Sequence, residues 1–139
     1  MQFLETHAEE LEADYPYKGV DGKCAEVATK GKVKATAVHS VTPNSVTQLK
    51  AAVVKGPVSV AVEADTAPFS HYTGGIINTT ACGTKTDHAV VVVGYADNYY
   101  IVRNSWGTAW GEKGYVRIAA VDGIGICAIQ SNPAYPDTI

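Results

Sequence analysis

The sequence predicts an α+β fold, in which helices lie in the first part of the chain and a mainly antiparallel β-sheet or barrel forms the rest. Apolar residues recur at helical spacing in two segments before residue 54. After residue 57, short apolar or alternating segments follow one another with brief links, which is typical of antiparallel strands. The 139 residues are enough for one domain with a buried core.

An amphipathic segment opens the chain. Residues 1–13 are predicted to form a helix, because Phe3, Leu4, Ala8 and Leu11 fall on one face with glutamates between them. The helix ends before the Tyr-Pro-Tyr segment that follows, since a residue that precedes proline avoids the helical conformation.

A strand and a second helix come next. Residues 32–41 alternate small apolar residues with polar ones, which predicts a strand. Thr42-Pro43 predicts a helix start, with Thr42 as N-cap and Pro43 at the first helical position, and Gly56-Pro57 predicts the end of that helix. Its buried face would comprise Val46, Leu49, Ala52 and Val53.

Strands dominate the remainder. Residues 58–62 alternate and predict a half-buried strand, whereas residues 88–94 form a continuous apolar run and predict a strand that is buried on both faces. Residues 99–104 and 115–119 predict two further strands, and Ala96-Asp97-Asn98 reads as a hairpin turn.

The composition argues against two classes of partner. The formal net charge is −3, and lysine and arginine form no basic patch, so nucleic acid is not expected as a partner. No apolar run approaches the roughly 20 residues that span a bilayer, so no membrane partner is expected. The first residues lack the basic and apolar segments of a signal peptide, and we expect none in this chain. The three Cys, eight Tyr and thirteen Gly are nevertheless typical of a secreted or vesicular protein.

Two polar residues at predicted strand ends indicate chemistry. His88 opens one apolar strand and Asn104 closes another, so pairing of the two strands would bring an imidazole and a side-chain amide together. A thiol-nucleophile site needs such a pair, because the His takes the proton of the Cys and a third group orients the His. Taken alone, a His at the edge of an apolar strand is more often a hydrogen-bonded core residue. No Cys at a helix N-terminus is visible in this sequence.

A set of motifs resembles one protein family. In chain order they are Gly56-Pro57-Val58-Ser59-Val60, Tyr72-Thr73-Gly74-Gly75-Ile76, Asp87-His88-Ala89-Val90, Val93-Gly94-Tyr95, Asn104-Ser105-Trp106-Gly107 and Trp110-Gly111-Glu112-Lys113-Gly114-Tyr115. Together they resemble the C-terminal part of a papain-like cysteine peptidase of the cathepsin L-like kind. Residues 10–24, which include Tyr15-Pro16-Tyr17 and Asp21-Gly22-Lys23-Cys24, resemble the end of the first domain of that family.

The resemblance implies a fold and a boundary. Members of this family have a helical domain and a β-barrel domain with the cleft between them. Residues 1–24 would be the remnant of the helical (left) domain, including its last helix, and a linker. Residues 25–139 would be the right domain, an antiparallel β-barrel with flanking helices. The segment that carries the oxyanion-hole Gln and the nucleophilic Cys in the family has no counterpart in these 139 residues.

The resemblance also implies roles for five residues. His88 corresponds to the catalytic base and Asn104 to the residue that orients its imidazole. Trp106 corresponds to the indole that shields the His–Asn hydrogen bond from water, and Trp110 belongs to the same loop. Ser105 would support the turn.

Substrate recognition is implied more loosely. Ala61, Thr86, Ala89 and Asn132 correspond to positions near the wall of the second subsite, and Asp87 would line the cleft. Each of them fits a purely scaffolding role equally well. A polar Asn132 near the floor of the pocket would argue against a strict preference for large apolar side chains.

The three cysteines receive different interpretations. Cys82 and Cys127 correspond to a disulfide within the barrel, with two buried free thiols as the alternative. Cys24 corresponds to a structural Cys that pairs with the missing N-terminal part, so we expect it to be unpaired here and not to be the nucleophile. The resemblance implies no cofactor and no metal ion.

Two functions remain open at this point. The chain would be part of a cysteine endopeptidase, lysosomal, vacuolar or secreted, that acts on peptides or proteins and is inactive without its helical part. The alternative is a non-catalytic papain-like domain with a binding or structural role, alone or in an assembly. Self-association through the face that normally meets the helical domain is a further possibility.

Overall fold

The computed structural model describes residues 1–138, with the side chains of residues 1–137. The chain forms two compact units. The larger unit is Ser40–Tyr135, and the smaller one is Met1–His39 together with the C-terminal residues from Pro136. This division by contacts is not the predicted family boundary between residues 24 and 25, which stays a prediction.

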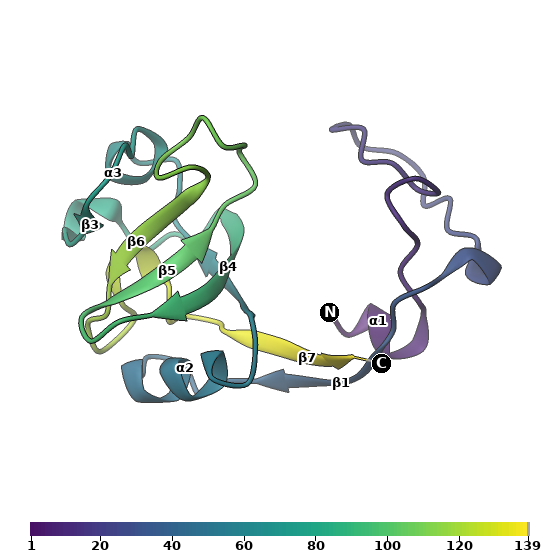
Figure 1. Ribbon diagram of the computed structural model, residues 1–139, viewed down its shortest axis with the longest axis horizontal. Coiled ribbons are helices and arrows are strands. Elements are labelled where there is room, and N and C mark those ends of the chain that lie inside the picture. Colours follow the sequence, from purple (N-terminus) through teal and green to yellow (C-terminus); the bar gives the residue numbers. More distant parts are fainter. Residues whose placement is uncertain (139) are drawn as a thin grey trace. The chain divides into compact units, whose positions relative to one another are not determined.

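Within residues 1–138, seven strands form one sheet in the order β1-β7-β2-β4-β5-β6-β3 (Figure 1). The strands are β1 (Ala35–Ser40), β2 (Val58–Val62), β3 (Ile76–Ile77), β4 (His88–Tyr95), β5 (Tyr99–Arg103), β6 (Tyr115–Ala119) and β7 (Ala134–Thr138). Strands β2, β4, β5 and β6 pair antiparallel with one another in that order, whereas β3 pairs parallel with β6. The predicted α+β class and its mainly antiparallel sheet are confirmed.

The helices are short. They are α1 (Phe3–Thr6), α2 (Val46–Val53) and α3 (Ala67–Ser70), with 3₁₀ turns η1 (Ala28–Lys30), η2 (Thr80–Cys82) and η3 (Ile126–Ala128). In the described part of the chain, none of the helices has the length and apolar character needed to cross a membrane.

The predicted helix over residues 1–13 is wrong in length, because helical structure is limited to Phe3–Thr6. Its N-cap, Gln2, makes no side-chain capping hydrogen bond, and none of its residues is buried. Ala35 is the one fully buried apolar residue among the described residues of the smaller unit. An isolated helix of this length is marginal in water, so amphipathic spacing without a packing partner does not hold it.

The second helix begins later than its Thr-Pro pair predicts. Ser45 is the N-cap, and its hydroxyl accepts a hydrogen bond from the backbone N–H of Gln48 at 3.3 Å. Asn44 has φ of +61°, a conformation that a right-handed helix does not contain. The predicted start at Thr42 is therefore wrong, whereas Leu49 and Ala52 are buried as the spacing predicts.

Strand β4, which precedes the predicted hairpin turn, is buried on one face and not on both. In β4, Val90 and Val92 are buried, whereas Val93 is 39% exposed. The predicted two-sided burial is wrong because β4 belongs to an antiparallel sheet, where one face commonly stays solvated. The buried face joins the alternating core residues of the neighbouring strands, which are Val58, Val60, Val62, Tyr100, Val102, Val116 and Ile118.

Candidate active site

His88 and Asn104 are in hydrogen-bond contact. The Nε2 atom of His88 lies 2.8 Å from Oδ1 of Asn104. The same oxygen accepts the backbone N–H of Ser105 at 2.7 Å, so it faces two donors and the orientation of the amide is fixed. Because an amide oxygen only accepts, His88 donates from Nε2, and its Nδ1 is then the acceptor in the neutral imidazole.

The strand register brings this pair together. β4 and β5 form a hairpin in which Val91 is paired with Arg103, so the start of β4 and the end of β5 lie at the same edge of the sheet. His88 is the first residue of β4 and Asn104 follows β5 directly. The Asn104 N–H donates to the Gly114 carbonyl at 3.0 Å. The predicted hairpin turn at residues 96–98 thereby sets the separation of the two side chains.

Three aromatic side chains pack together beside the imidazole. Trp106 is stacked on His88, with 4.9 Å between ring centroids and 30° between ring planes. The fully buried ring of Phe69, in α3, packs edge-on against Trp106 at 5.6 Å and tilted against Trp110 at 5.2 Å. Trp110 also donates its Nε1–H to the carbonyl of Ser70 at 3.2 Å. The sequence therefore gives His88 an apolar cover on one side.

The loop that carries both tryptophans is tied down by an ion pair. Arg117 donates from Nε and Nη2 to the two carboxylate oxygens of Glu112, at distances of 2.6–3.2 Å. Glu112 also accepts the backbone N–H of Gly75 at 3.1 Å. Hydrogen bonds from Arg117 hold the pKa of the Glu112 carboxyl below its usual value. This clamp joins the loop to the segment before β3.

Gly111 has no room for a side chain in this loop. Its φ is +56°, and an added Cβ would lie 2.7 Å from the carbonyl oxygen of Tyr115 and 2.9 Å from the ring of Tyr72. We expect Gly111→Ala to lower the free energy of unfolding, because a residue with a Cβ pays about 1–3 kcal/mol for this backbone conformation. The steric contacts of the added Cβ should increase this loss. Urea denaturation measures the effect.

A glycine in the same loop provides the matched control. Gly107 has φ of +84°, but no atom lies within 4 Å of the position of an added Cβ. Gly107→Ala therefore carries the conformational cost alone and should be less destabilising than Gly111→Ala. Equal losses in the two variants would contradict the steric argument.

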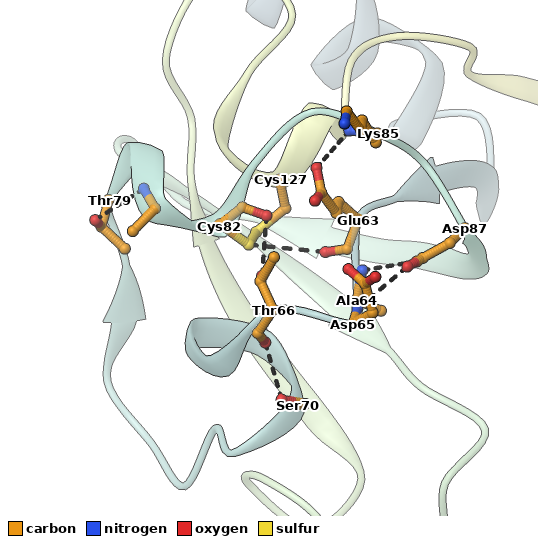
Figure 2. The surroundings of a disulfide bond; sticks show 11 residues. Glu63, Ala64, Asp65, Thr66, Ser70, Thr79, Cys82, Lys85, Asp87 and Cys127 are labelled. Atoms are coloured by element: carbon orange, nitrogen blue, oxygen red, sulfur yellow. Dashed lines mark hydrogen bonds between the residues drawn. A yellow bond between two sulfur atoms is a disulfide. The ribbon is translucent and has the colours of Figure 1, made fainter.

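Asp87 holds a turn beside the pair. Its two carboxylate oxygens accept the backbone N–H groups of Ala64 and Asp65 at 2.8 and 3.2 Å (Figure 2). The hydrogen bond from Ala64 is the largest cause that lowers the pKa of Asp87. In contrast, desolvation and the charge of Asp87 raise the pKa of Asp65. The residue before His88 thus links the start of β4 to the segment after β2.

Substitution of Asp87 and of Asp65 should affect the stability of the fold differently. Asp87→Asn is expected to reduce stability at neutral pH, because the ionised carboxylate is the better acceptor for two N–H groups. Because folding lowers the pKa of Asp87, this stabilisation is fully present at pH values above the unfolded-state pKa of about 3.9. It is lost as the pH falls through the pKa of the folded state. Asp65→Asn removes a repulsion and should not destabilise.

The urea midpoints of the wild type, Asp87→Asn and Asp65→Asn, measured between pH 2 and 7, check both expectations. The difference between wild type and Asp87→Asn should shrink at the acid end of this range. A difference that is the same at every pH would show that the charge of Asp87 does not contribute.

A disulfide joins Cys82 to Cys127, with 4.8 Å between the Cα atoms (Figure 2). Both residues are buried. The Thr66 hydroxyl donates to the Cys82 carbonyl at 3.0 Å, and the Ser70 hydroxyl donates to the Thr66 carbonyl at 2.9 Å. These contacts connect the disulfide to α3, the helix that carries Phe69.

The residues predicted to line a substrate pocket lie on three segments. Ala61 of β2 and Ala89 of β4 are directly paired, while Thr86 is exposed in the loop before β4. Asn132 is exposed two residues before Ala134, which pairs antiparallel with Ser59. Among the predicted pocket residues, the strand register brings together Ala61 and Ala89. The contribution of the set to binding stays a prediction.

Cys24 differs from the other two cysteines. It is exposed, it forms no disulfide among the described residues, and it lies outside any helix. Within residues 1–138, no group of three or more His, Cys, Asp or Glu side chains is placed to hold a metal ion.

Sequence reasoning did not identify the supports of the site. Phe69 lies in a four-residue helix, which is too short for a periodic pattern to reveal its buried side. Glu112 and Arg117 are five residues apart on a loop and a strand, so neither helical nor strand spacing pairs them. The two Gly residues that flank Glu112-Lys113 were a usable signal for a constrained loop.

Comparison with known proteins agrees with this arrangement of a His at a strand end, an Asn bonded to it and a stacked Trp. The family model described as "Papain family cysteine protease" matches residues 1–137. The chain belongs to this family. In sequence, it is 43% identical over 134 residues to Cysteine proteinase RD21A of Arabidopsis thaliana, and 38% identical over 139 residues to Mexicain of Jacaratia mexicana. These alignments cover 91% and 98% of the chain.

A solved structure shares the papain-like fold. The Carica candamarcensis cysteine protease CMS1MS2, whose crystal structure is a complex with E-64, superposes with a TM-score of 0.88 at 39% identity over 97% of this chain. The chain spans 29% of the length of RD21A, 64% of Mexicain and 64% of the CMS1MS2 chain. It therefore corresponds to a part of each of these relatives.

Proposed function

We propose that this chain is the C-terminal portion of a papain-like cysteine endopeptidase that hydrolyses peptide bonds in peptides or proteins. It supplies the base His88 and the orienter Asn104. The nucleophilic thiol and the oxyanion-hole Gln would come from the helical part of the peptidase, on the same or another chain. The observation that carries the proposal is the 2.8 Å contact between His88 Nε2 and Asn104 Oδ1.

This contact supports a role for one particular imidazole nitrogen in the chemistry. With Nε2–H donated to Asn104, Nδ1 accepts the proton of an attacking thiol and later donates it to the leaving amine. A rotated ring would offer the wrong nitrogen, so the amide contributes by holding one orientation and one tautomer. Trp106 supports this role because its stacked ring limits access of water to the hydrogen bond.

The chain alone is expected to be inactive. Of its three cysteines, two form a disulfide and the third, Cys24, is exposed and lies outside a helix. Asp87, Ala61, Thr86, Ala89 and Asn132 would contact substrate at the second subsite and the cleft. A lysosomal, vacuolar or secreted location fits the disulfide, because disulfides persist in oxidising compartments.

A complementation experiment tests the proposal. The purified chain is mixed with an N-terminal segment of a papain-family relative that carries the nucleophilic Cys. Hydrolysis of a fluorogenic peptide amide and labelling by a thiol-directed epoxide are then measured with and without that segment. We expect both signals only in the mixture, and a mixture with Asn104→Ala should hydrolyse more slowly.

Two outcomes would overturn the proposed peptidase function. Epoxide labelling of Cys24 in the chain alone would contradict the absence of a nucleophile. A complex that forms and is labelled, yet does not hydrolyse the peptide, would favour a non-catalytic papain-like domain with a binding or structural role. Light scattering of the chain alone, over a range of concentrations, tests the predicted self-association.

A further inference from the structure

One short sequence outside the catalytic edge has the form of a modification signal. Asn78-Thr79-Thr80 has a Thr two residues after an Asn, with a residue other than proline between them. This is the acceptor pattern for N-linked glycosylation in proteins that enter the secretory pathway. The other asparagines, Asn44, Asn98, Asn104 and Asn132, have no Ser or Thr two residues later.

We propose that Asn78 is an N-glycosylation site. It follows β3 directly and precedes η2, and Asn78, Thr79 and Thr80 are all exposed. Thr79 is the N-cap of η2, and its hydroxyl accepts the backbone N–H of Ala81 at 3.2 Å. The acceptor asparagine therefore lies on a surface turn whose geometry is set by its neighbour and not by its own side chain.

The surroundings leave room for a sugar. A shallow groove of about 440 Å³ runs beside Asn78 and is lined by Ile76 and His71, among others. Ile76 is 37% exposed, so the first sugar of a glycan would cover an apolar side chain that water now contacts.

The modification would leave the proposed catalytic edge open. Figure 2 shows Thr79, the neighbour of Asn78, on the opposite side of the disulfide from Asp87, the neighbour of His88. A glycan at Asn78 thus starts from a part of the larger unit that is separate from the His88–Asn104 pair. We expect glycosylation to shield this surface from solvent without lowering the rate of peptide hydrolysis by the proposed peptidase.

The transfer balances as a substitution at the sugar. The donor is an oligosaccharide carried on a lipid pyrophosphate, and an oligosaccharyltransferase of the secretory pathway catalyses the step. The bond between sugar C1 and the pyrophosphate oxygen breaks, and a bond between C1 and Nδ2 of Asn78 forms. Nδ2 loses one proton to a base of the transferase, and the lipid pyrophosphate leaves. The inference rests on the secretory location proposed above and not on peptidase activity.

Translation in the presence of endoplasmic-reticulum microsomes tests whether the sequence is an acceptor. The chain is given a cleavable secretion leader, and its gel mobility is compared before and after peptide-N-glycosidase. We expect one glycan-sized shift that the glycosidase reverses. Asn78→Gln and Thr80→Ala should both abolish the shift. Thr79→Ser is the matched control, because it keeps the cap hydroxyl and the acceptor pattern and should retain the shift.

Peptide mapping of the mature protein from its natural source tests whether the site is used. The glycosidase converts a glycosylated Asn into Asp, so we expect residue 78 to be read as Asp after treatment in most molecules. An unmodified Asn78 in the source protein would overturn the proposal, as would a microsomal shift that persists in Asn78→Gln. Neither readout depends on hydrolysis, so failure of this site is distinguishable from failure of the proposed peptidase function.

Discussion

Replacing His88 with alanine is expected to reduce kcat/KM of the reconstituted peptidase by about 10²–10⁴-fold, the range that a general acid–base residue contributes. Without the imidazole, the proposed acceptor of the thiol proton at the sheet edge is missing. The loss should appear mainly in kcat, because His88 acts on the reacting atoms. Asn104→Ala should cause a smaller loss, since it removes the orientation of the base and leaves the base itself. Initial rates with a fluorogenic peptide amide measure both effects.

The control for this prediction is another histidine of the same chain. His7 is exposed next to α1, where its ring is stacked on Phe3, and His7→Ala should change the rate less than about 2-fold. Titration with the N-terminal segment checks that His88→Ala still assembles. An assembled His88→Ala enzyme with nearly unchanged kcat would contradict the assignment of the base.

The contact between His88 and Asn104 could be predicted from sequence because its signal is local. His88 and Asn104 stand at the ends of two strands whose apolar runs and short turn are visible in the sequence, and a hairpin of that kind fixes which ends meet. Strands β2, β4, β5 and β6 were predicted close to their bounds for the same reason. Their packing then follows from alternation of apolar residues over one face.

The errors arose where tertiary contacts decide the local structure. Residues 1–13 have the spacing of a helix but no buried surface to pack against in the described part of their unit, so propensity alone was insufficient. At the start of α2, the N–H of Asn44 donates to the carbonyl of Gln130, a residue far along the chain, and the helix begins after it. Neither the missing packing surface nor the Asn44–Gln130 hydrogen bond can be recognised from the neighbouring sequence.

The support of the imidazole was invisible for a related reason. Phe69, Trp106 and Trp110 come from two separate segments, which the Trp110–Ser70 hydrogen bond and the ring contacts join. A Phe in a short Pro-containing turn has no periodic partner, so sequence patterns give it no assigned face. Its importance follows from burial alone.

We expect Phe69→Ala to be among the most destabilising single substitutions in this chain, lowering the free energy of unfolding by about 3–5 kcal/mol. The ring is fully buried, and it contacts Trp106, Trp110 and, with 6.3 Å between centroids, His88. Its removal would leave a cavity next to a helix that the Thr66–Cys82 hydrogen bond ties to the disulfide. Urea denaturation gives the loss, and Phe69→Leu should lose less because it refills part of the space.

The same substitution separates a packing role from a role in placing the tryptophans. If Phe69 holds Trp106 over His88, the near-ultraviolet circular dichroism of the tryptophans should weaken in Phe69→Ala under conditions where the far-ultraviolet signal is still native. Phe3, the other Phe of the chain, is 53% exposed, so Phe3→Ala should cost less than about 0.5 kcal/mol and leave both spectra unchanged. A Phe69→Ala protein that is destabilised but keeps the native tryptophan signal would mean that the ring stabilises the core without positioning the indole. The cover over the His88–Asn104 hydrogen bond would then depend on the Glu112–Arg117 clamp of the loop instead.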